Sequence, residues 1–395
     1  MRSGTRAVRS IIAISTWVVL ASACDPGSDF GATVERSTED GVERLVVRGP
    51  DTPLDWSFEA RVTIPPEADG DVRFMDVSPW EVGADREGRI YVLDGAGGRV
   101  VVFGGSGSMV GSMGRPGQGP GELSQPTALA VSADGEVAVH DYGTGGIARW
   151  GPSGELPPLE RLDVPFWGPE LGLTSWGLLY PSLAADGREG RIVRLVVKAE
   201  TRTGTLGEMT QTTVAASFPS CGLGGVPVEP IFSPQLHWAL GGDIVALVTG
   251  PRYEVEVFRS GVLERRISRV EEPRPATREL ALQEVAGGYE LTAPVRCRIS
   301  PTELVEARGF APVVPAISGL AVAPDGTLWV RRGRVTGEPE PSVDVYGTDG
   351  AYTGTLPPGS PFPVAFAGRA TAYRVVSLEP TDTGTIDIVL YEIVR

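Results

Sequence analysis

The stretch LAVSADGEVAVHD, residues 129–141, contains a short apolar strand, an Asp-Gly turn and a second apolar strand. Asp-Gly supplies the positive φ angles that tight hairpin turns require, so the stretch predicts a β-hairpin. Comparable strand pairs recur along the chain, which is typical of a repeat protein. They are VGADREGRIYVLD (82–94), LHWALGGDIVALV (236–248), LAVAPDGTLWVRR (320–332) and the weaker VAFAGRATAYRVV (364–376).

Each pair is followed by a third strand and by a fourth, often more polar strand, as in YEVEVFRSG (253–261) and VLERRISR (262–269). A degenerate copy fits residues 175–209. The turn glycines of the six units are then Gly88, Gly135, Gly177, Gly242, Gly326 and Gly368. Six such units predict an all-β fold, a six-bladed β-propeller of four-stranded blades over residues 55–395.

The two ends of this region predict how the ring closes. The last unit stops one strand short, whereas DWSFEARVTIP (55–65) is a spare strand before the first unit. We expect this N-terminal strand to complete the last blade, because closure removes an open sheet edge. The long spacing after Gly242 requires an insertion after blade four. Residues 271–288 predict a short helix there, followed by an irregular excursion to Pro315.

A glycine-rich run, GRPGQGPGELSQP (114–126), leads into the hairpin at 129–141. It resembles the G-x-G-P-G-[EQ]-F-x-x-P run of NHL-type repeats and of related bacterial six-bladed propeller lipoproteins, with Leu123 in place of phenylalanine. The resemblance implies a crossing from the outer strand of blade one to the inner strand of blade two. A phosphate-binding loop would need a following lysine or helix, and neither is present. The resemblance implies no particular activity, because propellers host several functions.

The N-terminus has the pattern of a secretory signal peptide over residues 1–23, with three arginines followed by an apolar run and small residues. The apolar run is too short to span a bilayer. Ser22 and Ala23 before Cys24 resemble a bacterial lipobox, which implies that acylated Cys24 anchors the chain to a lipid bilayer. An ordinary signal peptide that ends near a cysteine is the alternative. We expect a membrane-anchored lipoprotein of the bacterial cell envelope, facing the periplasm or the exterior, with residues 24–54 as its lipidated N-terminus and polar tether.

Charge and cysteine content limit the partners and the compartment. Removal of residues 1–23, which carry three arginines and no acid, would take the formal net charge from −15 to −18. A chain this acidic is a poor candidate for binding nucleic acid. Cys221 and Cys297 are the cysteines that remain after Cys24. In an oxidising compartment we expect them to form a disulfide, with two separate buried thiols as the alternative.

Four residues are candidates for the channel or for ligand binding. His140 precedes Asp141 at the end of one strand, and His237 precedes Trp238 at the head of blade four. The alternatives are structural: Asp141, like Asp94, would bond turn backbone, and His237 would be a satisfied, partly buried histidine. No catalytic residue, cofactor-binding residue or metal ligand is assigned from the sequence.

The function that we expect is a binding module whose ligand is unknown, acting through loops at one end of the channel. The alternative is a metal-dependent hydrolase or lyase with its site in the channel. We expect no cofactor, with calcium as the alternative. However, lactonase-type propellers use asparagines for calcium, and this sequence has none. Lyase-type domains use several histidines, and this chain has two.

Overall fold

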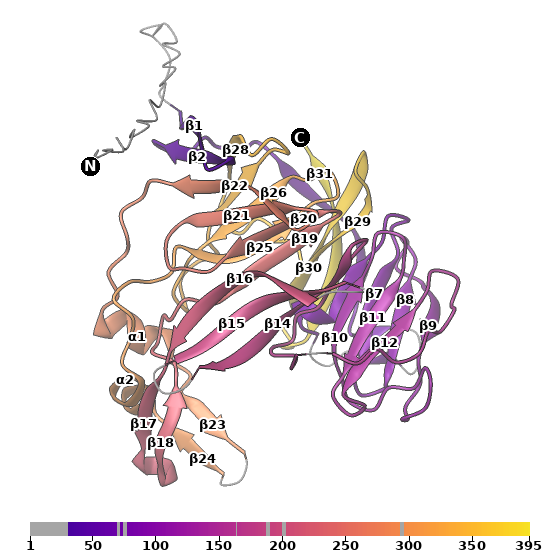
Figure 1. Ribbon diagram of the computed structural model, residues 1–395, viewed down its shortest axis with the longest axis horizontal. Coiled ribbons are helices and arrows are strands. Elements are labelled where there is room, and N and C mark those ends of the chain that lie inside the picture. Colours follow the sequence, from indigo (N-terminus) through magenta and orange to yellow (C-terminus); the bar gives the residue numbers. More distant parts are fainter. Residues whose placement is uncertain are drawn as a thin grey trace, which may run out of the picture.

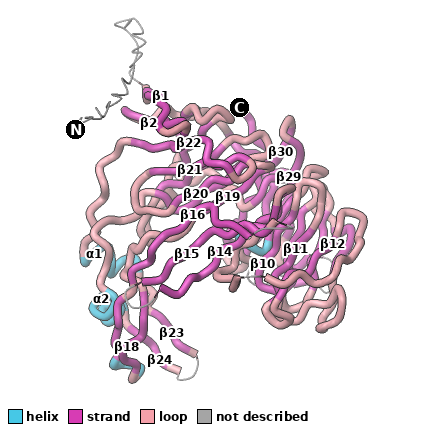
Figure 2. Tube along the Cα trace, viewed as in Figure 1, coloured by secondary structure: helices cyan, strands magenta, loops and turns pink. Residues whose placement is uncertain are grey.

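The computed structural model describes residues 31–68, 72–73, 77–162, 164–186, 190–199, 203–292 and 296–395. The predicted signal peptide and Cys24 lie outside these residues. Strands dominate the described chain, and its two α-helices lie together at one side of the molecule (Figures 1 and 2). The order of the strands in each sheet defines six blades around a central axis, which confirms the predicted all-β, six-bladed propeller.

Each blade is an antiparallel meander whose first strand is innermost. Blade one consists of β6 (Val82–Ala84), β7 (Ile90–Asp94), β8 (Arg99–Phe103) and β9 (Met109–Met113). Blade two consists of β10 (Pro126–Val131), β11 (Val137–Asp141) and β12 (Gly146–Trp150). Blade three consists of β13 (Gly172–Thr174), β14 (Gly177–Asp186), β15 (Gly190–Lys198) and β16 (Thr203–Thr212). Blade four consists of β19 (His237–Gly241), β20 (Ile244–Val248), β21 (Glu254–Arg259) and β22 (Val262–Arg269). Blade five consists of β25 (Ile317–Val322), β26 (Leu328–Arg332), β27 (Val343–Tyr346) and β28 (Tyr352–Leu356). Blade six consists of β29 (Ala365–Arg369), β30 (Ala372–Pro380) and β31 (Ile386–Val394), together with β3 (Ser57–Ile64).

The predicted turn glycines lie at or beside the first hairpin of each blade. Gly88, Gly135, Gly242 and Gly326 have φ angles of +82°, +85°, +62° and +86°, a region that other residues rarely adopt. Blade two corrects the four-stranded prediction, because it has three regular strands. Its fourth position is reduced to a single bridge between Ile147 and Glu160. Two prolines at 157 and 158, which lack the N–H that a ladder needs, precede that bridge.

The core lies between the blades. All five residues of β7, β11 and β20 are buried, because both faces of each blade pack against a neighbouring sheet. Tyr91 and Leu93 of blade one pack with Val137 and Val139 of blade two in one such layer. Each hydrophobic layer therefore joins two successive blades.

The N-terminal strand closes the ring as predicted. Strand β3 pairs antiparallel with β31, from Ser57 opposite Val394 to Ile64 opposite Ile388, and becomes the outer strand of blade six. Because β3 and β31 come from opposite ends of the described chain, the pairing joins the two ends without a covalent link. A short pair, β4 (Glu67–Ala68) and β5 (Val72–Arg73), and a 3₁₀ turn at Pro79–Glu81 lie between β3 and blade one.

The prediction of a polar tether over residues 24–54 is wrong for residues 33–48. These residues form a hairpin of β1 (Thr33–Glu39) and β2 (Val42–Arg48), and β2 pairs in parallel with β22 at the outer edge of blade four. Asp40 and Gly41 form its two-residue turn, both with positive φ, and Leu45 is fully buried. The Asp-Gly pair was a readable hairpin signal, but the exposed, polar β1 hid the strand pattern.

Between the hairpin and β3, the chain crosses the outer edge of blade five, where the Leu54 N–H donates to the Thr355 carbonyl at 3.0 Å. Residues 33–64, here called the strap, therefore contact blades four, five and six in turn. The strap covers the exposed edges of three consecutive blades, and an uncovered edge is open to pairing with other chains.

The strap also joins a set of buried charges at the seam between blades four and five. Asp344 is fully buried and accepts hydrogen bonds from Arg332 at 2.7 and 3.0 Å, from Thr355 at 2.6 Å and from Tyr253 at 2.7 Å. Arg332 also donates to Asp51 of the strap at 2.6 and 3.0 Å. With Arg269, which donates to Asp51 at 2.5 Å, these charges form the seam network of Asp51, Arg269, Arg332 and Asp344.

Two insertions that flank blade four fold together into an insertion module. The first carries β17 (Val214–Phe218) and β18 (Leu223–Val228), and the second carries α1 (Arg278–Glu284), β23 (Tyr289–Leu291), β24 (Cys297–Ile299) and α2 (Pro301–Arg308). Helix α1 confirms the predicted short helix. The irregular excursion to Pro315 is corrected, because it contains a hairpin and a second helix. Ser300 caps α2 by accepting from the Glu303 N–H at 3.2 Å, and Ser-Pro-x-Glu is a readable start signal.

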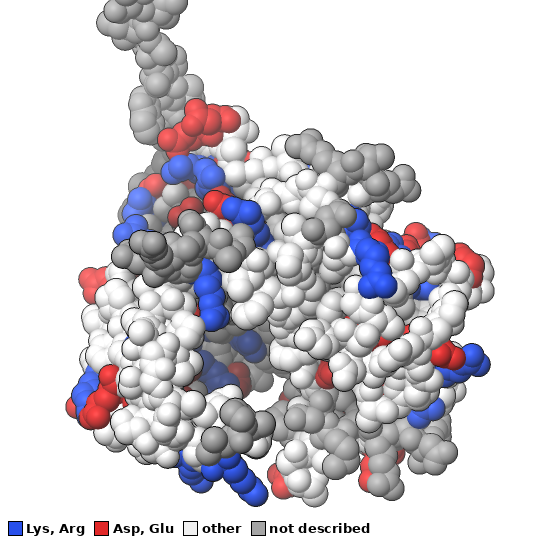
Figure 3. Space-filling model, turned by 60° about the horizontal axis from the view of Figure 1, so that its bottom comes forward, with Lys and Arg blue, Asp and Glu red and all other residues white. Residues whose placement is uncertain are grey.

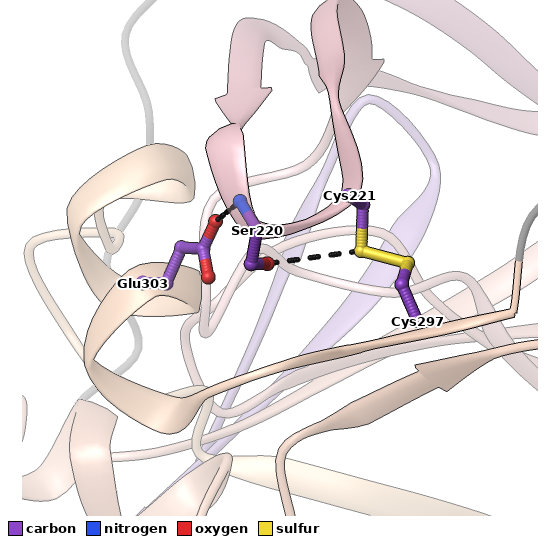
Figure 4. Close-up of a disulfide and its surroundings, with 4 residues drawn as sticks. All are labelled: Ser220, Cys221, Cys297 and Glu303. Atoms are coloured by element: carbon purple, nitrogen blue, oxygen red, sulfur yellow. Dashed lines mark hydrogen bonds between the residues drawn. A yellow bond between two sulfur atoms is a disulfide. The ribbon is translucent and has the colours of Figure 1, made fainter.

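A disulfide between Cys221 and Cys297 links the two insertions, as predicted, and excludes the alternative of two free thiols (Figure 4). The two Cα atoms are 5.6 Å apart, although the cysteines are 76 residues apart in the sequence. Beside the disulfide, the Ser220 backbone N–H donates to Glu303 of α2 at 3.0 Å. Phe218 and Leu304 are buried around it, so the module has a small apolar core of its own.

The glycine-rich run at 114–123 forms the crossing between β9 and β10, as predicted. It closes on itself: the Leu123 N–H donates to the Arg115 carbonyl at 2.9 Å, and the Gly119 N–H donates to the Glu122 carboxylate at 2.8 Å. The Gly117 N–H donates to the Leu123 carbonyl at 3.1 Å. Two of the glycine amides are therefore engaged within the loop, and the buried Leu123 anchors the loop to the core.

Candidate functional site

The central channel contains a cavity of about 1490 Å³. The innermost strands of all six blades, β6, β10, β13, β19, β25 and β29, contribute to its lining. Glycines on these strands let side chains of the next blade come close: a Cβ at Gly172 would lie 2.7 Å from the Trp238 ring, and a Cβ at Gly241 would lie 2.6 Å from Val322. The inner strands therefore form a close-packed wall around one large space, the most direct candidate for a ligand site.

The end of the channel at the first hairpins of the blades, the hairpin mouth, has paired charges. Asp85 is almost fully buried and accepts from Arg89 at 2.6 Å and from the Tyr91 hydroxyl at 2.9 Å. Arg86 pairs with Asp134 of blade two, and Arg369 pairs with Glu87 at 2.7 Å. These contacts join blades one, two and six, so the charges at this end have a structural role.

The opposite end, the loop mouth, is formed by the starts of the inner strands and by the loops that lead into them. Arg331 of β26 lies in its wall and donates to the Ser318 hydroxyl at 3.2 Å and to the Ser318 carbonyl at 3.3 Å. Its guanidinium lies over the Phe362 ring, 4.5 Å from the ring centroid. No carboxylate of the described chain lies within ion-pair distance of Arg331, and Glu340 is held instead by Arg334 at 2.8 Å.

The position of Arg331 depends on a glycine. Arg331 is opposite Gly319 in the β25–β26 ladder, and a Cβ at Gly319 would lie 3.2 Å from both the Arg331 guanidinium and the Phe362 ring. Burial lowers the pKa of Arg331; the nearby charge of Glu340 opposes that effect and that of Arg334 adds to it. A guanidinium that is half-buried and lacks a carboxylate partner presents free donors to the cavity.

Glu170 lies on another part of the same mouth, just before β13. Burial raises the pKa of Glu170 to about 7, and the N–H of the neighbouring Trp238 indole, which approaches the carboxyl, opposes the shift. That N–H is buried and does not reach full hydrogen-bond geometry with any group in the described ranges. Neither is there a cation within ion-pair distance of Glu170 in the part of the chain that the structure describes. A carboxyl group with this pKa changes charge near neutral pH.

His237 and Trp238, both predicted as channel residues, line the cavity at the start of β19. Burial lowers the pKa of His237 to about 4, and the charge of Arg331 adds to this effect. The imidazole is therefore neutral at physiological pH. Around the mouth, blade three supplies Glu170, blade four supplies His237 and Trp238, and blade five supplies Arg331.

His140 and Asp141, the other two candidates, do not line the cavity, so this part of the prediction is wrong. His140 lies on β11, where its Nδ1 is 2.7 Å from the Thr127 hydroxyl and its ring stacks on Phe166 with centroids 3.9 Å apart. Asp141 accepts backbone N–H groups of Ser124, Gln125 and Gly143 at 2.7–2.9 Å. The structural alternative is confirmed for Asp141, and Asp94 likewise accepts from the Gly97 N–H at 2.8 Å.

Glu170, Arg331 and Phe362 were not predicted as site residues from the sequence. Arg331 occupies the same place in its repeat as His140, but His140 is opposite Ala128, whereas Arg331 is opposite Gly319. The available signal was therefore a charged residue in an apolar strand together with a glycine in the partner strand. Glu170 and Phe362 lie in linkers between blades, where the repeat gives no register.

Within the described ranges, no three His, Cys, Asp or Glu side chains converge in an arrangement that could hold a metal ion. In the same residues, neither helix has the length and apolar character needed to cross a bilayer. In the view of Figure 3, the surface is hollowed between two lobes, with basic side chains visible inside the hollow.

The similarity of this chain to known proteins is limited to solved structures of low sequence identity. No protein-family model matches the sequence, and the search of curated proteins found no match. Similar solved structures include a protein from Bacteroides fragilis designated an exported protein, with 12% identity and a TM-score of 0.48, covering 89% of this chain and 100% of the other. A gluconolactonase from Xanthomonas campestris has 11% identity and a TM-score of 0.38, covering 87% and 98%. Virginiamycin B lyase from Staphylococcus aureus has 12% identity and a TM-score of 0.36, covering 85% and 88%.

Proposed function

We propose that this protein is an exported propeller that binds a small molecule at the loop mouth of its channel. The observation that carries the proposal is Arg331, a half-buried cation in the wall of a large cavity without a carboxylate partner among the described residues. Leaving a buried charge unpaired is unfavourable for folding, so a chain that keeps one beside a cavity has a reason outside its own stability. A ligand that supplies the missing anionic group is that reason.

The cellular setting that we propose follows from the N-terminus. The pattern of residues 1–23 supports export, and the Cys221–Cys297 disulfide is of the kind that forms in an oxidising compartment. Ser22, Ala23 and Cys24 support anchoring to a bilayer through acylated Cys24, and the run at 114–126 supports a relationship to NHL-type propeller lipoproteins. The protein would then present its channel to the periplasm or to the exterior of a bacterial cell.

The binding function is tested by native mass spectrometry of the full chain after exposure to a small-molecule extract from which macromolecules have been removed. We expect the wild-type protein to retain a bound small molecule and Arg331→Met to lose it. Arg369→Met is the matched control, because Arg369 lines the hairpin mouth and is paired with Glu87. Equal retention by wild type and Arg331→Met would contradict the proposal.

The proposal for the membrane anchor has its own test. Mass spectrometry of the mature N-terminal peptide should show Cys24 as the first residue, carrying acyl chains, and Cys24→Ser should release the protein from the membrane fraction. A mature terminus at another residue, without lipid, would contradict the anchor and leave the channel proposal unaffected.

A further inference from the structure

We propose that the ligand of the loop mouth is a zwitterion with well-separated charges, namely a short peptide with free termini. Its carboxylate end would lie at Arg331, Ser318 and Phe362, and its ammonium end at Glu170 and Trp238. This inference rests on the proposed function and adds the chemical class of the ligand.

The Arg331 side of the mouth is suited to a carboxylate. A guanidinium offers five donors in a planar fork that matches the two oxygens of a carboxylate. Ser318 accepts from Nε and Nη2 only, which holds the guanidinium in place, and Phe362 lies against its face. Glu340, the nearby acid that affects Arg331, is paired with Arg334. The fork is therefore positioned, and its edge is not taken by an internal acid.

The Glu170 side is suited to an ammonium group. The Glu170 carboxylate attracts a cation directly, and the Trp238 indole N–H, which lies against the same carboxyl, helps to hold it in place. Trp238 is fixed there by its packing over Gly172. The described chain places no cation of its own at Glu170. An ammonium group would offset the desolvation that disfavours the charged form of this carboxyl.

The two sides are too far apart for a free α-amino acid. Glu170 belongs to blade three and Arg331 to blade five, and β19 of blade four lies between them in the ring. Packed sheets are about 10 Å apart, and an extended chain spans about 3.3–3.6 Å per residue. Two such spacings, about 20 Å, separate blades three and five, so a peptide of about two to six residues would reach both sides, the shorter ones because the Arg331 and Glu170 side chains themselves bridge part of the span. Neutral His237, on β19 between them, would contact the peptide backbone.

The charges of Arg331 and Glu170 together favour a zwitterionic ligand. A ligand that carried only an anion would pair with Arg331 and leave the half-buried Glu170 carboxylate without a cationic partner. A ligand that carried only a cation would leave Arg331 without an anionic partner. One molecule with both termini free satisfies both groups.

The test uses three pools of mixed-sequence tripeptides: free termini, N-acetylated, and C-amidated. Binding to the full chain is measured by native mass spectrometry and then by calorimetry on a retained peptide. We expect the free pool to bind at least tenfold more tightly than either blocked pool. Arg331→Met should abolish the preference for a free C-terminus, and Glu170→Gln the preference for a free N-terminus. Arg369→Met and Asp134→Asn, at the hairpin mouth, should keep both preferences.

The pH dependence adds an independent readout. Among the described residues, Trp238 is the one side chain that affects the pKa of Glu170, and His237, next to Trp238 on β19, is neutral above about pH 5. Between pH 5.5 and 7.0 the ionised fraction of a carboxyl with this pKa rises roughly tenfold. Affinity for a free-termini peptide should rise by a similar factor and stay flat in Glu170→Gln. For an anion-only ligand the affinity would fall over the same range.

The outcomes separate this inference from the proposed function. Equal or tighter binding of the N-acetylated pool would overturn the zwitterion and leave a small-molecule site intact. Binding of no tripeptide pool, with an Arg331-dependent ligand still retained from the extract, would overturn the peptide alone. Absence of any Arg331-dependent ligand in both experiments would overturn the site as well.

Discussion

The seam between blades four and five and the loop mouth of the channel both bury charged side chains at least in part, but they differ in how those charges are paired. At the seam, Asp344 has Arg332, Thr355 and Tyr253 as partners. At the loop mouth, neither Arg331 nor Glu170 has an oppositely charged partner among the described residues. The seam network joins the strap to two blades, whereas the charges at the mouth face a cavity.

The difference shows how to separate structural charges from functional ones in this fold. Burial raises the pKa of Asp51, but the hydrogen bonds and charges of Arg332 and Arg269 outweigh it and hold that pKa below its usual value. At the mouth, burial has the larger effect: it raises the pKa of Glu170 and lowers the pKa of Arg331, so both shifts favour the neutral form. Paired charges stabilise the fold, and the unpaired ones at the mouth are those that we propose to contact a ligand. Four substitutions test this contrast.

Replacing Asp344 should have the largest effect on stability. Asp344→Ala leaves Arg332 without its buried partner and removes the acceptor for Tyr253, so we expect a loss of about 3–5 kcal/mol in the free energy of unfolding. Urea denaturation measures the loss, and Asp344→Asn, which keeps the shape and some hydrogen bonds, should lose less. A change below 1 kcal/mol in Asp344→Ala would show that the seam network is not what holds the two blades together.

Replacing Glu170 should change stability in the opposite direction, and only at higher pH. The pKa of Glu170 in the folded protein, about 7, is above its ordinary value of 4.5, so the folded state disfavours the ionised form. Glu170→Gln should therefore raise the free energy of unfolding by up to about 3 kcal/mol at pH 8, where the penalty is nearly complete, since one pKa unit corresponds to about 1.4 kcal/mol. At pH 4, where the carboxyl is protonated in both states, the variant should match the wild type. A stability loss at pH 8 would mean that Glu170 has a partner in the folded protein.

Replacing Arg331 should affect ligand binding far more than stability. Burial already disfavours its charge, so Arg331→Met should change the free energy of unfolding by less than about 1 kcal/mol, toward higher stability. Thermal unfolding without ligand measures this change, and the extract experiment measures the binding loss. A large destabilisation would mean that Arg331, like the charged residues of the seam network, stabilises the fold.

Replacing Arg369 should have the smallest effect. Its ion pair with Glu87 at the hairpin mouth is exposed, and exposed pairs contribute little. Arg369→Met should change the free energy of unfolding by less than about 0.5 kcal/mol and leave ligand binding unchanged. Loss of ligand binding in this variant would mean that the binding site extends through the whole channel.

Local pattern in the sequence was sufficient for most of the architecture. The Asp-Gly and Gly-Gly turns identified the first hairpin of each blade, and the missing last strand identified β3 as its replacement, because a hairpin and a strand count are properties of short segments. The disulfide was predictable from two cysteines in a chain with a signal-like N-terminus. The strap hairpin could have been read from Asp40 and Gly41, but its outer strand is polar and is held by backbone pairing with β2, which leaves no apolar alternation to detect.

The site depended on contacts that no single repeat contains. Glu170, His237 and Arg331 come from three consecutive blades, and the packing of these blades around the channel brings them to one mouth. Arg331 and His140 have the same place in their repeats, yet Gly319 opposite Arg331 opens a path to the cavity that Ala128 does not. The sequence by itself determined the number of blades, their turns and the way the ring closes, because these follow from neighbouring residues. Which charges find partners was decided by the tertiary structure alone, because pairing depends on distances between strands far apart in the chain.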